Sequence, residues 1–325
     1  MIYSDIKNFA RQFEWEPKIE NKPFFGKKYA GFIVAGMGGS HLAADIIRCW
    51  LPECDLMTWE NYGLPPLEPK ELKKRLIIAS SYSGNTEETI DAASLAHKNG
   101  YPLAVLASGG KFLEFAKENK IPYVQLPHQD IQPRMALGWS IRAMLAVMDK
   151  IAELGETSLL QKLLQPEHHE KEGNALAQKL KGSVPIIYSS ARNSAIAKIW
   201  KIKFNETGKI PAFYNVFPEL NHNEMTGFDI QPVTAALSKN FHCVILRDND
   251  DDTRVQKRME ILRSLYEKRG LRVEEIQMKE SPRLHKIFSA IVLADWVSYY
   301  TAQLYKVEPE QVPMVEEFKK LIISH

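Results

Sequence analysis

The feature that most constrains this fold is a repeated unit: a short apolar run, a turn of small residues, and a stretch with helical periodicity. Short buried strands that alternate with helices indicate a parallel sheet covered on both faces. In the first half of the chain the predicted strands are Tyr29–Ala35, Leu76–Ser80, Leu103–Ala107 and Tyr123–Leu126. The predicted helices are Leu42–Trp50, Glu87–Lys98, Lys111–Glu118 and a long closing helix, Met135–Leu154.

The second half repeats this plan after a polar linker with helical periodicity, Gly155–Lys181. Its predicted strands are Pro185–Ser189, Cys243–Arg247 and Val273–Gln277, and its predicted helices are Ala195–Phe204, Arg254–Lys268 and Leu284–Leu304. The segment Ile186–Asn193 repeats the segment Ile33–Ser40: in each, the end of an apolar strand and a turn of small residues precede a helix. We therefore predict two copies of one α/β unit, as domains 1–154 and 155–325. The turn of the second copy has no glycines, which suggests that the two copies have different functional roles.

Composition excludes several classes of protein. The chain of 325 residues has 42 basic and 40 acidic residues, a net charge of +2, so we expect no nucleic-acid partner. No apolar run reaches the roughly 18 residues that span a bilayer, so we expect no membrane partner. Residues 1–15 contain Asp5, Arg11 and Glu14 and do not resemble a secretory signal. The three cysteines form no CxxC pair and are interpreted as free thiols in a reducing cytoplasm.

Two predicted strand-to-helix turns could bind an anion. Gly36–Ser40 (GMGGS) offers glycine backbone and the N–H groups of a helix start, and its alternative reading is a plain tight turn. The second turn, Ser80–Glu87, contains four Ser and Thr hydroxyls and could hold a phosphate without a lysine. Helix capping by Ser83 or Thr86 is its alternative reading. Two such turns in one sheet favour phosphate binding.

Further candidates lie outside these turns. Glu206 lies at the end of a predicted helix, where a carboxylate meets the negative end of the helix dipole. This placement is unfavourable unless Glu206 has another use or points to solvent. His222 lies between two asparagines and could act as an acid or base, or belong to a polar helix start capped by Asn221. Arg134 lies at the start of the long predicted helix of the first half, and Lys306 lies at the end of the last predicted helix. The acidic turn Asn249–Asp252 is interpreted as a solvated loop and helix cap.

Taken together, these segments resemble the bifunctional phosphoglucose/phosphomannose isomerases, which are built from two sugar isomerase (SIS) domains. The resemblance rests on GMGGS at Gly36–Ser40, SYSGNT at Ser81–Thr86 and PELNHNE at Pro218–Glu224, and it extends from about Phe24 to Leu321. It implies two similar SIS domains, each a parallel β-sheet flanked by helices on both faces in a three-layer αβα arrangement. It also implies an aldose–ketose isomerase acting on sugar phosphates.

The resemblance assigns roles by motif. Ser40, Ser81, Ser83 and Thr86, with the Gly39 backbone, would hold the substrate phosphate. Glu206 would move the proton between C1 and C2, and Arg134 would stabilise the enediolate. Lys306 and His222 would assist ring opening, with His222 donated by the neighbouring subunit of a homodimer. No cofactor and no metal are implied, and the polar positions Ser298 and Thr301 are candidates for lining the space around C2.

Three alternatives remain open at this stage. A non-catalytic SIS protein that senses sugar phosphates would need a DNA-binding arm, and few residues precede the first strand. The isomerase half of a glucosamine-6-phosphate synthase normally follows a glutaminase domain with an N-terminal cysteine, which the sequence does not show. An isomerase specific for glucose 6-phosphate would share the mechanism and differ only in substrate.

Overall fold

The computed structural model describes residues 2–21, 28–127 and 131–323; Phe24, where the resemblance begins, lies outside them. The chain divides into two compact units, one formed by Asn8–Gln165 and the other by Met1–Lys7 with Pro166–His325. The units do not end where the predicted domains end. The first residues pack with the second unit, and the chain passes from one unit to the other at Gln165 rather than at Leu154.

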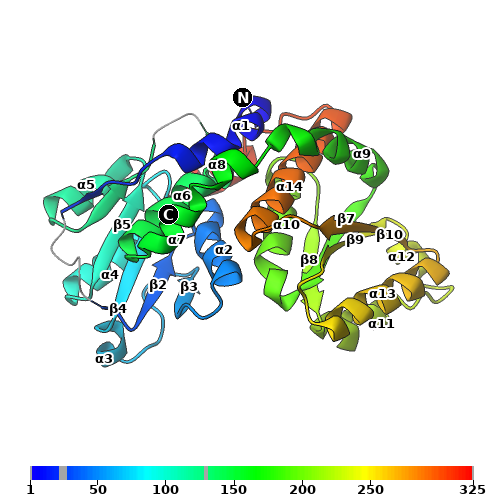
Figure 1. Cartoon of the computed structure of the whole chain (residues 1–325), viewed down its shortest axis with the longest axis horizontal. Coiled ribbons are helices and arrows are strands. Elements are labelled where there is room, and N and C mark those ends of the chain that lie inside the picture. The colour runs from blue at the N-terminus through cyan, green and yellow to red at the C-terminus, as the bar shows by residue number, and fades with distance from the viewer. Residues whose placement is uncertain (1, 22–27, 128–130, 324–325) are drawn as a thin grey trace. The chain divides into compact units, whose positions relative to one another are not determined.

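The unit Asn8–Gln165 contains a six-stranded sheet in the order β1-β6-β5-β4-β2-β3. Figure 1 labels its strands β5, β4, β2 and β3. Its five longer strands run parallel, and β1 pairs antiparallel with β6. The strands are β1 Ile19–Glu20, β2 Gly31–Ala35, β3 Leu56–Trp59, β4 Arg75–Ser80, β5 Leu103–Ala107 and β6 Tyr123–Gln125. The helices are α2 Leu42–Trp50, α3 Pro69–Leu72, α4 Glu87–Lys98, α5 Gly110–Glu118, α6 Leu137–Val147, α7 Ile151–Thr157 and α8 Leu160–Leu163.

The other unit contains a four-stranded parallel sheet in the order β10-β9-β7-β8. Read from β8, this order matches β3-β2-β4-β5 of the first sheet, with β7 in the place of β2. The predicted fold class, two similar units with helices on both faces of a parallel sheet, is therefore confirmed. The strands are β7 Val184–Ser190, β8 Phe213–Phe217, β9 Phe241–Asp248 and β10 Arg272–Met278. The helices are α1 Ile2–Lys7, α9 Glu170–Leu180, α10 Ser194–Glu206, α11 Glu224–Gly227, α12 Ala235–Ser238, α13 Thr253–Lys268, α14 Arg283–Tyr305 and α15 Pro313–Ile323.

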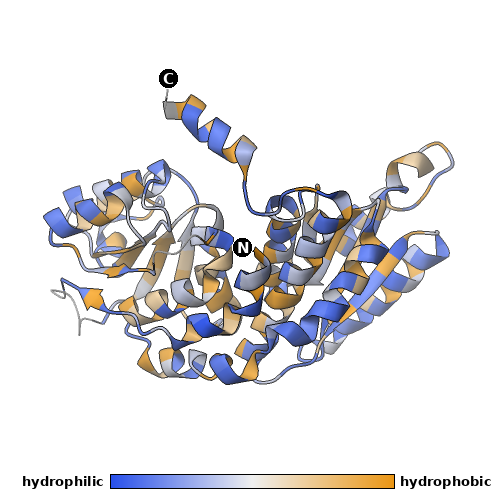
Figure 2. Cartoon of the chain, turned by 90° about the horizontal axis from the view of Figure 1, so that it is seen from above, coloured by the Kyte–Doolittle hydropathy of each residue, from blue (hydrophilic) through white to orange (hydrophobic). Residues whose placement is uncertain are grey.

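Each sheet buries apolar side chains against its helices. One face of the first sheet packs through residues such as Ile77 and Val105 against Ala93 of α4 and Phe112 of α5. In the second sheet Ile245 packs with Leu262 of α13. On α10, Trp200 is fully buried and its indole N–H donates to the Ala290 carbonyl of α14 at 2.9 Å. The helices accordingly show hydrophobic stripes and hydrophilic outer faces (Figure 2).

The structure corrects several sequence-based expectations. The predicted helix Met135–Leu154 is wrong: α6 ends at Val147, and α7 begins at Ile151 after Asp149, which has a left-handed φ of 58°. Strands β3 and β8 were not predicted, because each has only one buried residue. In the acidic turn, Asp252 caps α13 as expected, but Asp251 is buried rather than solvated.

A buried ion pair joins two helices of the second unit. Lys203 of α10 lies 2.5 Å from Asp295 of α14, measured from Nζ to Oδ1, and both side chains are at most 1% exposed. Removing one partner of a buried ion pair leaves an uncompensated charge, whereas replacing both with apolar groups can be nearly neutral.

We therefore expect Lys203→Met to lower the free energy of unfolding by about 3–5 kcal/mol. The double variant Lys203→Met with Asp295→Leu should regain most of that loss. Denaturant unfolding of the full chain measures both. A double variant no more stable than the single one would contradict this account of the pair.

Candidate functional site

The two predicted anion-binding turns lie at one edge of the first sheet. They follow β2 and β4, which pair in parallel from Gly31 with Arg75 to Ala35 with Ala79. The chain leaves β2 toward β3 on one side and later returns to β4 on the other side. Such a change of direction is where open parallel sheets bind ligands, outside the carboxyl ends of the strands.

Ser40 connects the two turns. Its hydroxyl accepts a hydrogen bond from the Tyr82 backbone N–H at 3.0 Å, and its carbonyl accepts one from the Ser80 hydroxyl at 2.9 Å. A Cβ at Gly36 would lie 2.8 Å from the Ser80 carbonyl oxygen, so only glycine fits there. The turns after β2 and β4 thus form one hydrogen-bonded assembly.

The second turn presents hydroxyls before a helix. Ser81 donates to the Thr86 hydroxyl at 2.9 Å and accepts from the Gly84 N–H at 3.1 Å. Thr86 is the residue before α4, but its side chain makes no capping bond, while Ser83 is exposed. The capping interpretation therefore does not account for Thr86. The helix start and these hydroxyls together can receive an anion.

A third turn, which the sequence analysis did not single out, supports the second. Ser108–Gly110 follows β5, and the Ser108 hydroxyl donates to the Tyr82 carbonyl at 2.6 Å. Gly84 and Gly110 both have left-handed φ angles, and a Cβ at Gly84 would lie 1.8 Å from the Gly109 carbonyl oxygen. The sequence signal was available: Ser-Gly-Gly follows an apolar strand, as GMGGS does.

Arg134 lies beside the first turn, although not on the predicted helix. It belongs to a 3-10 turn, Pro133–Met135, that precedes α6, and its side chain is buried. A Cβ at Gly39 would lie 2.9 Å from the Arg134 backbone nitrogen, which explains the glycine. The guanidinium donates to the Gln132 side chain at 3.3 Å. The first unit thus brings Gly39, Ser40, Ser81, Ser83, Thr86 and Arg134 to one edge of its sheet.

In the second unit, Glu206 is the last residue of α10 and is partly buried. The Lys209 ammonium donates to the Glu206 carbonyl at 2.7 Å and also to the Gln311 carbonyl. Lys306 directly follows α14, is exposed, and has a left-handed φ of 54°. Lys209 therefore ties the end of α10 to the segment that follows Lys306.

His222 is exposed at the end of a 3-10 turn, Glu219–His222. The following carboxylate is held firmly: Glu224 accepts from the Tyr188 hydroxyl at 2.5 Å and from the Asn215 amide at 2.6 Å. Burial, with the nearby Glu224 charge, raises the pKa of Tyr188 well above its usual range. Asn223, rather than the expected Asn221, caps the helix after His222.

In the second unit, hydrogen-bonded side chains occupy the turn after β7. The Ser190 hydroxyl donates to Asp251 at 2.7 Å, and Arg283 and Lys286 each donate to Asp248 at 2.6 Å. Burial alone would raise the pKa of Asp248, but the hydrogen bond from Lys286 and the charge of Arg283 hold it below its usual value. Neither Ser189 nor Ser190 was assigned a phosphate, and this carboxylate-rich network gives an anion no reason to bind there.

Ser298 and Thr301, the candidates for lining the space around C2, lie on the last long helix. Both are buried in α14, where their hydroxyls donate to the carbonyls of Asp295 and Val297 at 3.0 and 2.8 Å. Within the described residues, one group of three possible metal ligands occurs, His41, Asp45 and Glu60, and it includes none of the predicted site residues.

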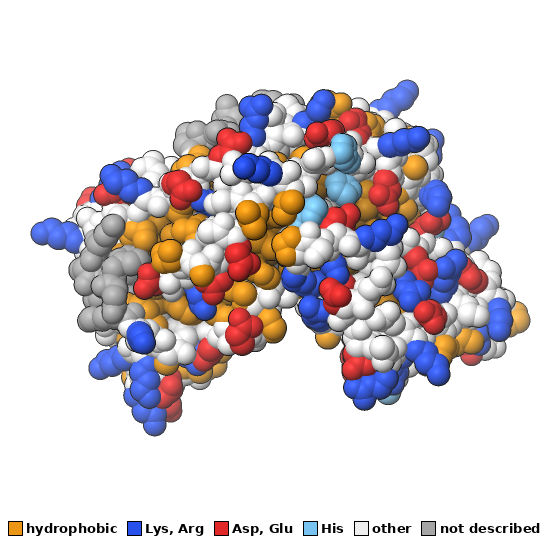
Figure 3. Space-filling model, in the orientation of Figure 1, with side chains coloured by type: hydrophobic (Ala, Val, Ile, Leu, Met, Phe, Trp, Pro, Cys, Tyr) orange, Lys and Arg blue, Asp and Glu red, His pale blue; other side chains and the backbone are white. Residues whose placement is uncertain are grey.

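Charges of both signs are interspersed on the face shown in Figure 3, as the near-zero net charge predicts. Among the helices of residues 2–21, 28–127 and 131–323, none combines the length and apolar character that a bilayer crossing requires.

Comparison with known proteins gives three kinds of match. Residues 169–322 match the family model described as the bacterial phospho-glucose isomerase C-terminal SIS domain. The bifunctional phosphoglucose/phosphomannose isomerase of Caldicellulosiruptor bescii is 35% identical over 88% of each chain. Its namesake in Aquifex aeolicus is 29% identical over 100% of this chain and 99% of the relative. The crystal structure of glucosamine-6-phosphate deaminase from Thermotoga maritima shares the fold, with a TM-score of 0.69, 15% identity and 96% of each chain covered.

The contact between the second and third turns yields a stability prediction. Gly84→Ala should lower the free energy of unfolding by about 2 kcal/mol or more, because it combines left-handed strain with a backbone clash. Gly100→Ala is the matched control, since Gly100 has a similar φ of 66° and open space around its Cβ position. Denaturant midpoints of the full chain test this, and equal losses for the two variants would contradict the proposed contact.

Proposed function

The chain belongs to the bifunctional phosphoglucose/phosphomannose isomerase family, and we propose that it interconverts glucose 6-phosphate or mannose 6-phosphate with fructose 6-phosphate. The names of the relatives support sugar-phosphate isomerisation as the reaction class. The observation that carries the proposal is the assembly of two hydroxyl-bearing turns, joined by Ser40, at the edge of the first sheet.

This assembly suits a phosphate dianion. Ser81 and Thr86 lie next to each other, Ser83 is exposed beside them, and the twelve-residue helix α4 begins one residue later. The helix start contributes N–H groups and a partial positive charge. The hydroxyls with the Gly39 N–H would hold the phosphate, which is remote from the reacting carbons and therefore serves to position them.

Glu206 is proposed as the base. In the open-chain aldose it removes the C2 proton, and electrons move toward the C1 carbonyl oxygen to give an enediolate. The same carboxyl group then returns the proton to C1, while the C2 hydroxyl gives up its proton to become the ketose carbonyl and the oxygen on C1 takes up a proton to become a hydroxyl. One carboxylate thus serves both half-reactions, and no redox cofactor or metal is needed for the proton transfer. The bond from Lys209 to the Glu206 carbonyl supports this role, because it fixes the backbone at the end of α10.

Arg134, Lys306 and His222 complete the proposed machinery. A buried guanidinium at Arg134 keeps its charge at any working pH and would stabilise the enediolate. Lys306 and His222 would transfer protons in ring opening, and both are exposed. We propose that His222 acts in the active site of the neighbouring subunit of a homodimer. Because its side chain is exposed, a second subunit can reach it.

Two other functions make different predictions. A sugar-phosphate sensor binds substrate without turning it over, and a glucose-specific enzyme is inert toward mannose 6-phosphate. Measuring fructose 6-phosphate formation from both substrates side by side separates all three. Turnover of both supports the bifunctional reading, turnover of glucose 6-phosphate alone the narrower enzyme, and turnover of neither the sensor.

Glu206→Gln should reduce turnover by about a thousandfold or more, because the amide cannot accept the C2 proton. Incorporation of solvent deuterium at C1 and C2 should be lost, while sugar-phosphate binding remains. Glu267→Gln is the matched control: Glu267 is exposed on α13, pairs with Arg263, and should be dispensable. Near-normal turnover in Glu206→Gln would show that another group is the base.

The shared site can be tested by mixing two inactive variants, Glu206→Gln and His222→Ala. In random dimers half the molecules are mixed, and each mixed dimer has one intact site, so about a quarter of all sites should regain activity. Refolding the variants together and assaying turnover measures this. A mixture as inactive as its components would contradict the exchange of His222.

A further inference from the structure

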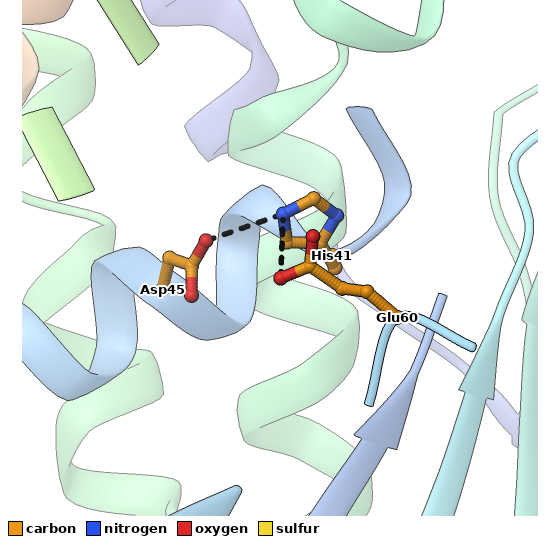
Figure 4. Close-up of side chains that lie close together, drawn as sticks. All are labelled: His41, Asp45 and Glu60. Atoms are coloured by element: carbon orange, nitrogen blue, oxygen red, sulfur yellow. Dashed lines mark ion pairs between the residues drawn. The ribbon is translucent and has the colours of Figure 1, made fainter. Parts of the chain in front are cut away.

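Three side chains that could bind a metal ion meet directly after the first turn. His41 follows Ser40, Asp45 lies one helical turn further along α2, and Glu60 follows β3 (Figure 4). A spacing of four residues places His41 and Asp45 on the same face of the helix. Strand β3 pairs in parallel with β2, from Phe32 with Leu56 to Ala35 with Trp59. The sheet therefore delivers Glu60 to the edge where α2 begins.

The imidazole side chain of His41 is buried, and its ring nitrogens are unsatisfied. Its side chain is 2% exposed, and neither ring nitrogen has a hydrogen-bond partner among the described residues. Buried polar groups in proteins almost always have such a partner, so an exception calls for an explanation. The Nε2 atom is directed at both carboxylates, 3.3 Å from Asp45 Oδ2 and 3.5 Å from Glu60 Oε1 (Figure 4).

These separations fit ligands that share an ion. Neither carboxylate forms a hydrogen bond with Nε2 in the structure, although both lie close to it. Two ligands each about 2.0–2.1 Å from a tetrahedral zinc ion lie about 3.4 Å apart. The three candidate ligand atoms all lie within 4.8 Å of one another. The geometry therefore needs little adjustment to surround one cation.

The donor set indicates which cation. Imidazole nitrogen with carboxylate oxygen suits zinc and related transition metals, whereas calcium and magnesium prefer oxygen alone. Two carboxylates match the charge of a divalent ion. Arg48 lies 3.9 Å from the other Asp45 oxygen, Oδ1, and is half exposed, so it does not stand between Oδ2 and His41.

We propose that His41 Nε2, Asp45 Oδ2 and Glu60 Oε1 bind a divalent cation of the zinc type, with one coordination position open to water. The ion would join the start of α2 to the end of β3, and so hold in place the turn that contains Ser40. No step of the proposed isomerisation uses it, and the site does not depend on that proposed function.

The test measures zinc bound to the full chain. Protein stripped with a chelator is dialysed against Zn²⁺, and bound metal is counted by mass spectrometry. Wild type should retain one more zinc per chain than Glu60→Gln, and zinc affinity at this site should fall at least about tenfold in that variant. Glu60 is exposed, so the variant is expected to fold, and circular dichroism checks this. Glu53→Gln, on the exposed segment between α2 and β3, is the matched control and should bind like wild type.

Thermal unfolding provides a second measurement. Zn²⁺ should raise the midpoint of wild type and Glu53→Gln, because an ion that binds the folded chain stabilises it, and should raise that of Glu60→Gln less. Asp45→Asn should behave like Glu60→Gln. Equal zinc content and equal midpoint shifts in wild type and Glu60→Gln would overturn the site. An equal rise with Mg²⁺ or Ca²⁺ would overturn the assignment to a zinc-type ion.

Discussion

The pairing of β2 with β4 is the constraint on which the candidate site depends. It places Gly36 against the Ser80 carbonyl and lets Ser40 bond to both Ser80 and Tyr82. Neither turn could hold this shape alone, because Ser40 finds its partners forty residues away in the chain. The helix start at α4, the supporting turn at Ser108 and the backbone of Arg134 are all arranged around this contact.

The second unit uses the same strand order for a different purpose. Its turn after β7 is closed by Ser190, Asp251 and a charged network that includes Arg283 and Lys286. A carboxylate inside such a turn satisfies the hydroxyl that would otherwise be offered to a phosphate. This agrees with the absence of glycines from the turn of the second copy. Glycine lets the backbone approach a ligand closely, and a turn that binds no ligand does not need this. The two units share a topology and differ in what fills the turn.

Much of the local structure could be predicted because its signals are local. The helices Leu42–Trp50 and Glu87–Lys98 have the predicted bounds, since a buried strand, a turn and an apolar stripe define them. The break at Asp149 escaped prediction because no glycine or proline marks it. Strand β8 escaped because it lies at a sheet edge, where few side chains are buried. The buried Asp251 escaped because its partners come from β7 and the turn after it, distant in sequence.

The sequence by itself determined the strand-turn-helix units, their repetition, the family resemblance and the residue types available in each turn. These follow from periodicity, glycine placement and motif spacing, which are properties of neighbouring residues. Only the tertiary structure decided that Ser40 links two turns and that Glu60 meets His41 and Asp45. The physical reason is that strand order and parallel register set the distances between residues far apart in the chain, and no local pattern encodes that order.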